Sequence, residues 1–198
     1  MHKKAPACWL TLAIAMAGVA QAQPDPTPLP VPGTTERFQE GGVALSELRA
    51  YAELGYVSAQ YRLAQRYLQG QGVMRDVPQA ALWFRRAADS GEPRSQLELA
   101  LMHLRGEGVQ RSERMAAHWM RQAAESGFQR AQLHVGTMYE HGLGVAKDQT
   151  EAYFWYCLAS EGVWGNHEAV QARDRLGALL TNVQRASARS AAFYWRPR

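Results

Sequence analysis

Histidine is the residue type in this sequence that is best suited to binding a metal ion. His134 and His141 stand seven residues apart, which places them two turns apart on one face of a helix. A zinc site needs two further ligands that converge on the same point, and no other residue has an obvious spacing to supply them. His103 stands where related segments of the chain hold tyrosine, so a packing role is expected. We therefore predict no metal site.

Cys157 is the one cysteine that follows residue 22. Nucleophilic catalysis requires a Ser or Cys beside a histidine and an orienting acid, whereas the related segments of the chain hold Arg85 and Arg121 at the position of Cys157. This pattern favours a small buried thiol. The chain contains no Ser-x-x-Lys motif, and Lys147 is the only lysine after residue 22. No catalytic residue and no cofactor-binding residue is predicted, and the chain is expected not to be an enzyme.

A repeat of 36 residues organises the part of the chain that holds these side chains. Each of three units carries a Gly-x-Gly-Val turn, a later tryptophan and several alanines in the same register. The glycine turns resemble phosphate cradles, but their threefold recurrence indicates a structural role. The equivalent positions are Gly70, Gly106 and Gly142; Gly72, Gly108 and Gly144; Trp83, Trp119 and Trp155; Ala80, Ala116 and Ala152.

Each unit is predicted to form two helices. In the first unit, Ala59, Leu63, Ala64 and Tyr67 share one helical face, and the turn that begins at Gly70 ends this first helix. The second helix is expected to begin near a capping residue, and Pro78 fits its first turn because the missing amide costs little there. The equivalent capping residues are Asp76, Ser112 and Asp148.

These residues and their copies resemble the Sel-1-like repeat family, the α/α solenoid relatives of tetratricopeptide repeats. The resemblance implies an all-α, right-handed α/α solenoid of about three and a half helix-pair repeats with a C-terminal helical cap. The solenoid is assigned to residues 36–165, with full units at about 56–91, 92–127 and 128–162, and the cap and basic tail to 166–198. Family members typically hold protein partners, so a scaffold or adaptor is expected.

The ends of the solenoid depart from the repeat. Residues 40–55 resemble the second helix of a degenerate preceding unit, with Ala44, Leu48 and Ala52 in register with its packing face. Residues 169–180 form a helical stretch, and Thr181 with Gln184 makes a capping box that begins a last helix. Solenoids need such a cap to cover the core face of their last unit.

The N-terminus predicts export. Residues 1–22 combine two lysines, an apolar run of about a dozen residues and an Ala-x-Ala end, which is the pattern of a signal peptide cleaved near Ala22. Residues 23–35 hold alternating prolines and are predicted to be an extended linker. After cleavage the net charge falls from +4 to +2, with 20 basic and 18 acidic residues, which argues against nucleic acid binding. The expected location is the periplasm, or secretion.

A candidate binding surface lies on the first helix of each unit, opposite the predicted packing face. Its positions differ among the repeats, whereas the packing positions recur, as a surface that recognises a partner would show. We expect it to bind a protein or peptide of the cell envelope on the concave side of the solenoid, with Leu101, Met102 and Met138 as an apolar centre. The positions are Arg62, Gln65, Arg66, Gln69, Glu98, Leu101, Met102, Arg105, His134, Thr137, Met138 and His141.

Two alternatives stay open at this point. Some exported, cysteine-rich members of the family have been linked to β-lactam binding or hydrolysis, so a repeat-type envelope hydrolase or β-lactam-binding protein is the second hypothesis. This sequence lacks the paired cysteines of those members. The C-terminus holds six arginines and one aspartate in its last 28 residues, ending in Phe193, Tyr194 and Trp195. It is either a solvated cap with an aromatic end packed on the body or an anchor for a partner or an anionic envelope surface.

Overall fold

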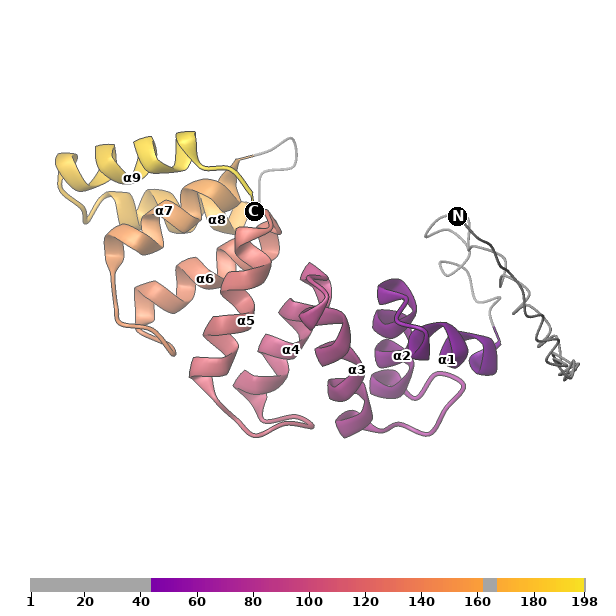
Figure 1. Cartoon of the computed structure of the whole chain (residues 1–198). Helices are drawn as coiled ribbons and strands as arrows, with labels where there is room; N and C mark the ends of the chain where they lie inside the picture. The colour runs from indigo at the N-terminus through magenta and orange to yellow at the C-terminus, as the bar shows by residue number, and fades with distance from the viewer. Residues whose placement is uncertain (1–43, 162–166, 198) are drawn as a thin grey trace, which may run out of the picture. The chain divides into compact units, whose positions relative to one another are not determined.

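The computed structural model describes residues 44–161 and 167–197, and within these residues every regular element is an α-helix (Figure 1). The predicted signal peptide, the linker and the start of the predicted solenoid lie outside the described residues and stay predictions. The described helices are α1 (Leu45–Glu53), α2 (Val57–Gln69), α3 (Val77–Asp89), α4 (Pro93–Arg105), α5 (Glu113–Glu125), α6 (Gln129–His141), α7 (Gln149–Ser160), α8 (His167–Gly177) and α9 (Asn182–Tyr194).

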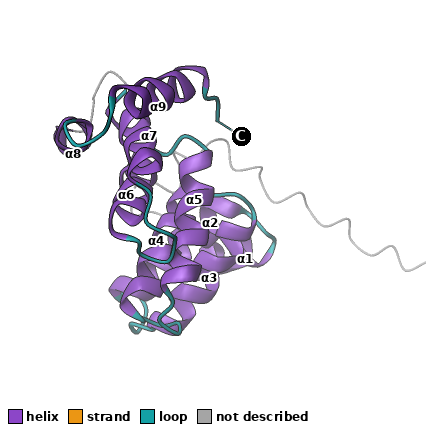
Figure 2. Ribbon diagram, turned by 90° about the vertical axis from the view of Figure 1, so that its left-hand side faces the viewer, coloured by secondary structure: helices purple, strands orange, loops and turns teal. Residues whose placement is uncertain are grey.

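The helices pack in sequence order, as a solenoid requires. α2 pairs with α3, α4 with α5 and α6 with α7, and α3 and α5 also pack against the first helix of the next unit. Figure 2 shows the described helices from the side, joined by loops. This arrangement confirms the predicted all-α solenoid of three helix pairs, which α1 precedes as the remaining half unit. None of the helices in the described ranges is both long enough and apolar enough to cross a membrane.

Capping side chains fix where the second helices begin. The side chains of Asp76, Ser112 and Asp148 accept hydrogen bonds from backbone amides in the first turns of α3, α5 and α7, which confirms the predicted caps. The turn between α6 and α7 depends on Gly144, whose φ is +71° and whose added Cβ would lie 2.1 Å from the carbonyl oxygen of Glu113. Only glycine allows this turn to touch the start of α5.

The core repeats with the sequence. Trp83, Trp119 and Trp155 are all buried, which confirms that they pack in the core rather than offer a binding platform. A second repeated feature was not identified from the sequence. Gln60, Gln96 and Gln132 are buried, and each donates its amide to a carbonyl oxygen of the preceding helix, those of Ala52, Ala88 and Ala124, at 3.1–3.3 Å. These bonds satisfy carbonyl groups at helix ends and join consecutive units.

The two ends of the solenoid agree with the sequence in outline. Leu48 and Ala52 of α1 are buried as predicted, but Ala44 is exposed, because α1 begins at Leu45 and Ala44 is its N-cap. At the other end, α8 and α9 both pack against α7. The predicted capping box of Thr181 and Gln184 is present at the start of α9.

Candidate functional site on the face of the first helices

The first helices α2, α4 and α6 present one row of partly accessible side chains each. All nine of these side chains were predicted to bind a partner, and none of them is fully buried. We call this surface the first-helix face. It consists of Arg62, Gln65 and Gln69 on α2, Glu98, Leu101 and Arg105 on α4, and His134, Thr137 and His141 on α6.

The predicted apolar centre of this surface is wrong. Met102 and Met138 are each only 3% exposed and belong to the hydrophobic core. Their position is one residue past the row of Leu101 and Thr137, and this rotation of about 100° turns the side chain from the surface toward the core. Arg66, at the equivalent position of α2, is half-buried. Leu101 is therefore the apolar side chain that remains on the first-helix face.

Contacts between side chains join the rows of neighbouring units. The guanidinium of Arg94 on α4 stacks over the ring of Tyr61 on α2, at 4.5 Å from its centroid. Tyr61 accepts a hydrogen bond of 2.9 Å from the side-chain amide of Gln65. Burial raises the pKa of Tyr61 although Arg94 opposes this shift, so the phenol stays neutral. The row on α2 is thereby held next to the row on α4.

Two partly buried ionisable groups occupy equivalent positions on α4 and α6. Burial raises the pKa of Glu98, and Arg130 and Arg105 oppose the shift. Burial also lowers the pKa of His134, and the positive charge of the nearby Arg130 lowers it further. The charge of Arg130, on α6, acts on both groups. Burial thus disfavours the charged form of Glu98 and of His134, and a partner that changes their burial changes their pKa values.

A pocket closes the C-terminal end of the first-helix face. It has a volume of about 450 Å³ and lies between α6 and α8, with the ring of Tyr156 from α7 among its lining residues. Thr137 and His141 of the first-helix face belong to it. We call it the α6–α8 pocket; its lining residues are Leu133, Thr137, Glu140, His141, Tyr156, Glu168, Gln171, Ala172 and Arg175. Its volume suits one large side chain or a short chain terminus.

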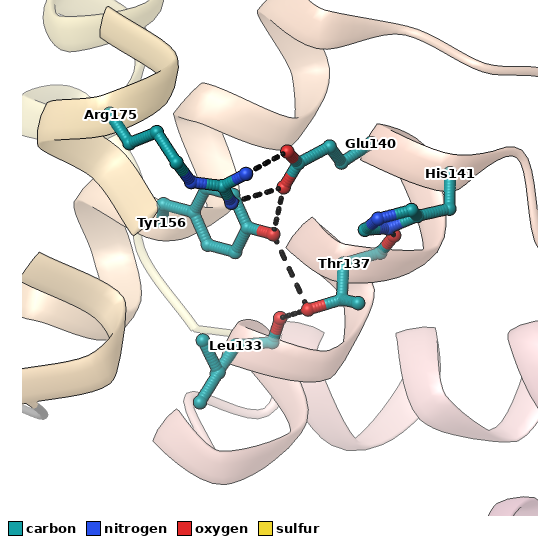
Figure 3. A network of polar contacts seen from close by, with 6 residues as sticks. All are labelled: Leu133, Thr137, Glu140, His141, Tyr156 and Arg175. Carbon is teal, nitrogen blue, oxygen red and sulfur yellow. Dashed lines mark hydrogen bonds and ion pairs between the residues drawn. The ribbon is translucent and has the colours of Figure 1, made fainter. Parts of the chain in front are cut away.

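A polar network fixes the wall of this pocket (Figure 3). The guanidinium of Arg175 on α8 binds both carboxylate oxygens of Glu140 on α6, at 2.9 and 3.0 Å. The hydroxyl of Tyr156 donates to Glu140 at 2.7 Å and lies 3.3 Å from the hydroxyl of Thr137. Burial raises the pKa of Tyr156, and the Glu140 carboxylate adds to this shift, so the phenol remains a donor. The network joins α6, α7 and α8.

His141 extends the network to the surface. Its Nδ1 lies 2.9 Å from the carbonyl oxygen of Thr137, so Nδ1 carries the proton of the neutral ring. The Nε2 atom is then an acceptor at the pocket mouth. His134 and His141, which share one helix face as the sequence indicated, take no part in a metal cluster: residues 44–161 and 167–197 hold no group of three potential ligands.

Sequence reasoning missed Glu140, Tyr156 and Arg175. Two signals were present. The third unit has Gly136 where the others have alanine, and Tyr156 where they have Phe84 and Met120. A larger side chain opposite a smaller one indicates a locally different packing. Arg175 carried no signal, because it lies in the cap, outside the repeat.

Cys157 behaves as the sequence predicted. The thiol is buried, and burial raises its pKa, opposed by a hydrogen bond with Tyr153 and the charges of Arg173 and Arg189. The adjacent Ser160 hydroxyl donates to the carbonyl of Cys157 and accepts from Arg173. A protonated thiol is a poor nucleophile, so the geometry offers no support for catalysis at this residue.

Helix pairs that stack in sequence order define an α/α solenoid, a fold that serves as a scaffold for protein–protein interaction. The chain belongs to the Sel1 repeat family: the model of the Sel1 repeat matches residues 57–92, 93–128 and 129–162, which together make up more than half of the chain. Proteins of this family are generally scaffolds without enzymatic activity.

Solved structures support this assignment. A Sel1 repeat protein from Oxalobacter formigenes is 40% identical, with a TM-score of 0.61 over 66% of this chain and 97% of that one. The structure of c5321, a protective antigen present in uropathogenic Escherichia coli strains and displaying an SLR fold, is 30% identical, with a TM-score of 0.58 over 76% of this chain and 40% of that one.

A curated relative matches a shorter segment. The secretory immunoglobulin A-binding protein EsiB of Escherichia coli O6:H1 is 47% identical over 47 residues, which are 24% of this chain and 10% of EsiB. The matched regions thus span a tenth of the length of EsiB and two fifths of that of c5321.

Proposed function

We propose that this protein is an exported scaffold that binds an acidic segment of a protein partner along the first-helix face. The observation that carries the proposal is the continuity of that face: nine side chains that vary between repeats lie on three neighbouring helices and end at a pocket of about 450 Å³. Many of the packing positions beneath them recur, among them Gln60, Gln96 and Gln132. Variation on a constant frame is what recognition of one particular partner requires.

The charge of the first helices indicates the chemistry of the partner. α2, α4 and α6 carry five arginines and two glutamates. Glu140 pairs with Arg175 of the cap, and Arg94 and Arg105 pair with Glu92 and Glu107. The other charged residues of these helices are Arg62, Arg66, Arg130 and Glu98, which leaves an excess of positive charge. An acidic partner segment complements this surface and is steered to it over about one Debye length.

The apolar part of the surface is small. Leu101 lies in the central row, flanked by arginines of α2 and α4, and the α6–α8 pocket offers a second apolar wall through Leu133 and Ala172. A segment that combines acidic residues with one or two large apolar side chains fits both. Two such anchors separated by arginine contacts resemble the centre and rim of a protein interface.

Export is the second part of the proposal. It is supported by the N-terminal pattern of residues 1–22 and by the relatives, since EsiB is a binding protein for secretory immunoglobulin A and c5321 is a protective antigen. Both properties belong to proteins that meet host molecules. The intact mass of the protein recovered from a periplasmic fraction tests this part: a chain that begins near Gln23 is expected, and a chain that retains Met1 contradicts it.

Site-specific photo-crosslinking in living cells tests the binding face. A photoreactive residue at Gln69, on the first-helix face, is expected to give discrete adducts. The matched control is the same replacement at Gln122, an exposed glutamine on the second helix α5, outside the first-helix face. Mass spectrometry of the Gln69 adducts identifies the partner. Adducts of equal yield at both positions, or at Gln122 alone, overturn the assignment of this face.

Charge reversal tests the chemistry of the partner. Arg62→Glu with Arg105→Glu is expected to reduce capture of the crosslinked partner at least tenfold, because two attractive contacts become repulsive. Arg114→Glu on α5 is the control and should leave capture unchanged. Met102→Asp is unsuitable for this purpose, since it places a carboxylate in the core. Labelling with a fluorescent penicillin tests the hydrolase alternative and is expected to be negative.

A further inference from the structure

The cap helix α9 differs in its exposed surface from the second helices of the repeats. α3 exposes Arg85 and Asp89 beside the apolar Leu82, and α5 exposes Arg114 and His118, so charged or ionisable side chains dominate both surfaces. On α9 the exposed residues are small, polar or apolar, with Arg189 the one that carries a charge. From Arg175 to the C-terminus the sequence contains no Asp or Glu.

Large apolar side chains are exposed at both ends of α9. Leu179 is 70% exposed, Val183 79%, Phe193 69% and Tyr194 73%. Val183 and Tyr194 are eleven residues apart, about three helical turns, and so point to the same side of α9. We call these four residues the cap patch. Leu179 precedes α9, and Phe193 is turned by about 100° from Tyr194, toward a neighbouring hollow. The four exposed apolar side chains thus flank the accessible side of α9 and mark an interaction surface.

A hollow of about 440 Å³ opens beside the cap patch. It is lined by Arg173 of α8 and Arg189 of α9, with the hydroxyls of Ser160 and Ser190 and the ring of Phe193. Arg189 is oriented by a hydrogen bond of 2.8 Å from its Nε to the hydroxyl of Tyr153. The remaining lining residues are Cys157 and Glu161, and Arg173 also pairs with Asp174.

We propose that the cap patch binds an anionic lipid surface, with Arg189, beside Phe193, in contact with a lipid phosphate group. Guanidinium and hydroxyl donors match the oxygens of a phosphate. Tyr194 and Phe193 suit the boundary between headgroups and acyl chains, where aromatic rings gather in membrane-bound proteins. Arg185, Arg189 and Arg196 add attraction to anionic lipids. This is the arrangement of a helix that lies on a membrane without crossing it.

Charge decides between the lipid surface and a second copy of the chain. Two α9 helices that met through the cap patch would bring Arg189 and Arg196 of one copy near those of the other, and the sequence after Asp174 offers no acidic residue to pair with them. The repulsion disfavours a dimer, whereas an anionic bilayer is complementary. The proposal is independent of the first-helix face, and it assigns to the cap the attachment of the scaffold to the envelope.

Vesicle sedimentation tests the proposal. The protein is expressed with its own N-terminus in a Gram-negative host and purified in the form that the cell produces. Binding is measured to vesicles of phosphatidylglycerol with phosphatidylcholine and to vesicles of phosphatidylcholine alone. Binding is expected with phosphatidylglycerol only, with at least a tenfold loss at 1 M salt, where the Debye length falls to about 3 Å.

Variants locate the contact. Phe193→Ser with Tyr194→Ser is expected to weaken the partition coefficient about tenfold, and Arg196→Gln about fivefold. The matched controls are Met74→Ser, which removes an apolar side chain that is 89% exposed elsewhere, and Arg114→Gln. Circular dichroism confirms that each variant is folded. Equal binding to both kinds of vesicle, equal loss in variants and controls, or a concentration-dependent dimer that the cap variants abolish overturns the proposal.

Discussion

The second helices α5 and α7 occupy equivalent places in consecutive units, yet one faces solvent and the other lies in the core. His118 and Arg121 of α5 are exposed, whereas Phe154 and Cys157 at the same positions of α7 are half-buried and buried. Leu158 replaces Gln122 in the same way. The backbone geometry of the repeat therefore does not decide whether a helix is internal. A few outer side chains do, and on α7 they attract α8 and α9.

A pair of substitutions between α6 and α7 also distinguishes the third unit from the central one. In the central unit Ala100 of α4 corresponds to Gly136 of α6, and Met120 of α5 corresponds to Tyr156 of α7. A Cβ at Gly136 would lie only 2.5 Å from the ring of Tyr156. Because Gly136 has no methyl group, the ring of Tyr156 fits against α6. Its hydroxyl then binds Glu140, which also binds Arg175 of the cap. The smaller residue at position 136 and the larger one at position 156 together allow the third unit to bind the cap instead of a further repeat.

Restoring the outer residues of α5 on α7 should have the largest effect. Cys157→Arg with Leu158→Gln places a charge and an amide where α8 and α9 pack. We expect the free energy of unfolding to fall by about 3–5 kcal/mol, because a buried charge without a partner is among the costliest changes. Urea denaturation followed by circular dichroism measures the loss.

The reverse exchange on α5 is the control. Arg121→Cys with Gln122→Leu removes the hydrogen bond and the stacking contact of Arg121 with Tyr139, and should cost only about 1 kcal/mol. Equal losses in the two double variants would show that the outer face of α7 does not hold the cap.

Gly136→Ala should have the next largest effect. The added methyl group displaces the ring of Tyr156 and weakens its hydrogen bond to Glu140, at a cost of about 2 kcal/mol after the gain in helix propensity. Ala100→Gly, the opposite change in the central unit, should cost about 1 kcal/mol through propensity and lost packing. Thermal unfolding of both variants checks the difference, and a Gly136→Ala protein more stable than the wild type contradicts the close approach.

The sequence predicted most of the frame and the two helices of the cap, but not the side-chain contacts that hold the cap to the last repeat. The helix pairs, the caps at Asp76 and Ser112 and the buried tryptophans each depend on local chemistry that recurs every 36 residues, so three copies support each interpretation. Met102 was misplaced because one residue of helical rotation separates surface from core, and repeat comparison alone does not resolve that step. Arg175 and Glu140 are 35 residues apart, on helices that only the packing around α7 brings together.

Glu140→Gln is expected to have a moderate effect. It removes the charge that Arg175 binds through both nitrogens but keeps an acceptor for Tyr156, so the loss should be about 1 kcal/mol. Amide hydrogen exchange should become faster in α8, because this contact holds α8 to α6. Glu107→Gln is the control: its ion pair with Arg105 is exposed and long, at 3.8 Å, and should contribute less than about 0.5 kcal/mol. Unchanged exchange in α8 would show that packing on α7 alone holds the helix.

The smallest expected effect concerns the equivalent residues Glu98 and His134. Burial raises the pKa of Glu98 above its ordinary value of 4.5, so the folded protein binds a proton there more readily than the unfolded chain. The resulting cost appears as pH rises through the raised pKa and is absent below the ordinary value. Glu98→Gln should therefore stabilise the protein at neutral pH, by about 0.5 kcal/mol, and not at pH 4.

The effect of His134 on stability depends on pH in the opposite direction. Burial lowers its pKa below the ordinary value of 6.5, so its cost is absent at high pH and develops as pH falls below that value. His134→Gln should therefore leave stability unchanged at pH 8 and raise it, by about 0.5 kcal/mol, below pH 6. Urea titrations of both variants across this range separate the two residues. Curves that run parallel to the wild type at all pH values would mean that neither group is held at a cost, and that the central and terminal rows of the first-helix face do not differ in this respect.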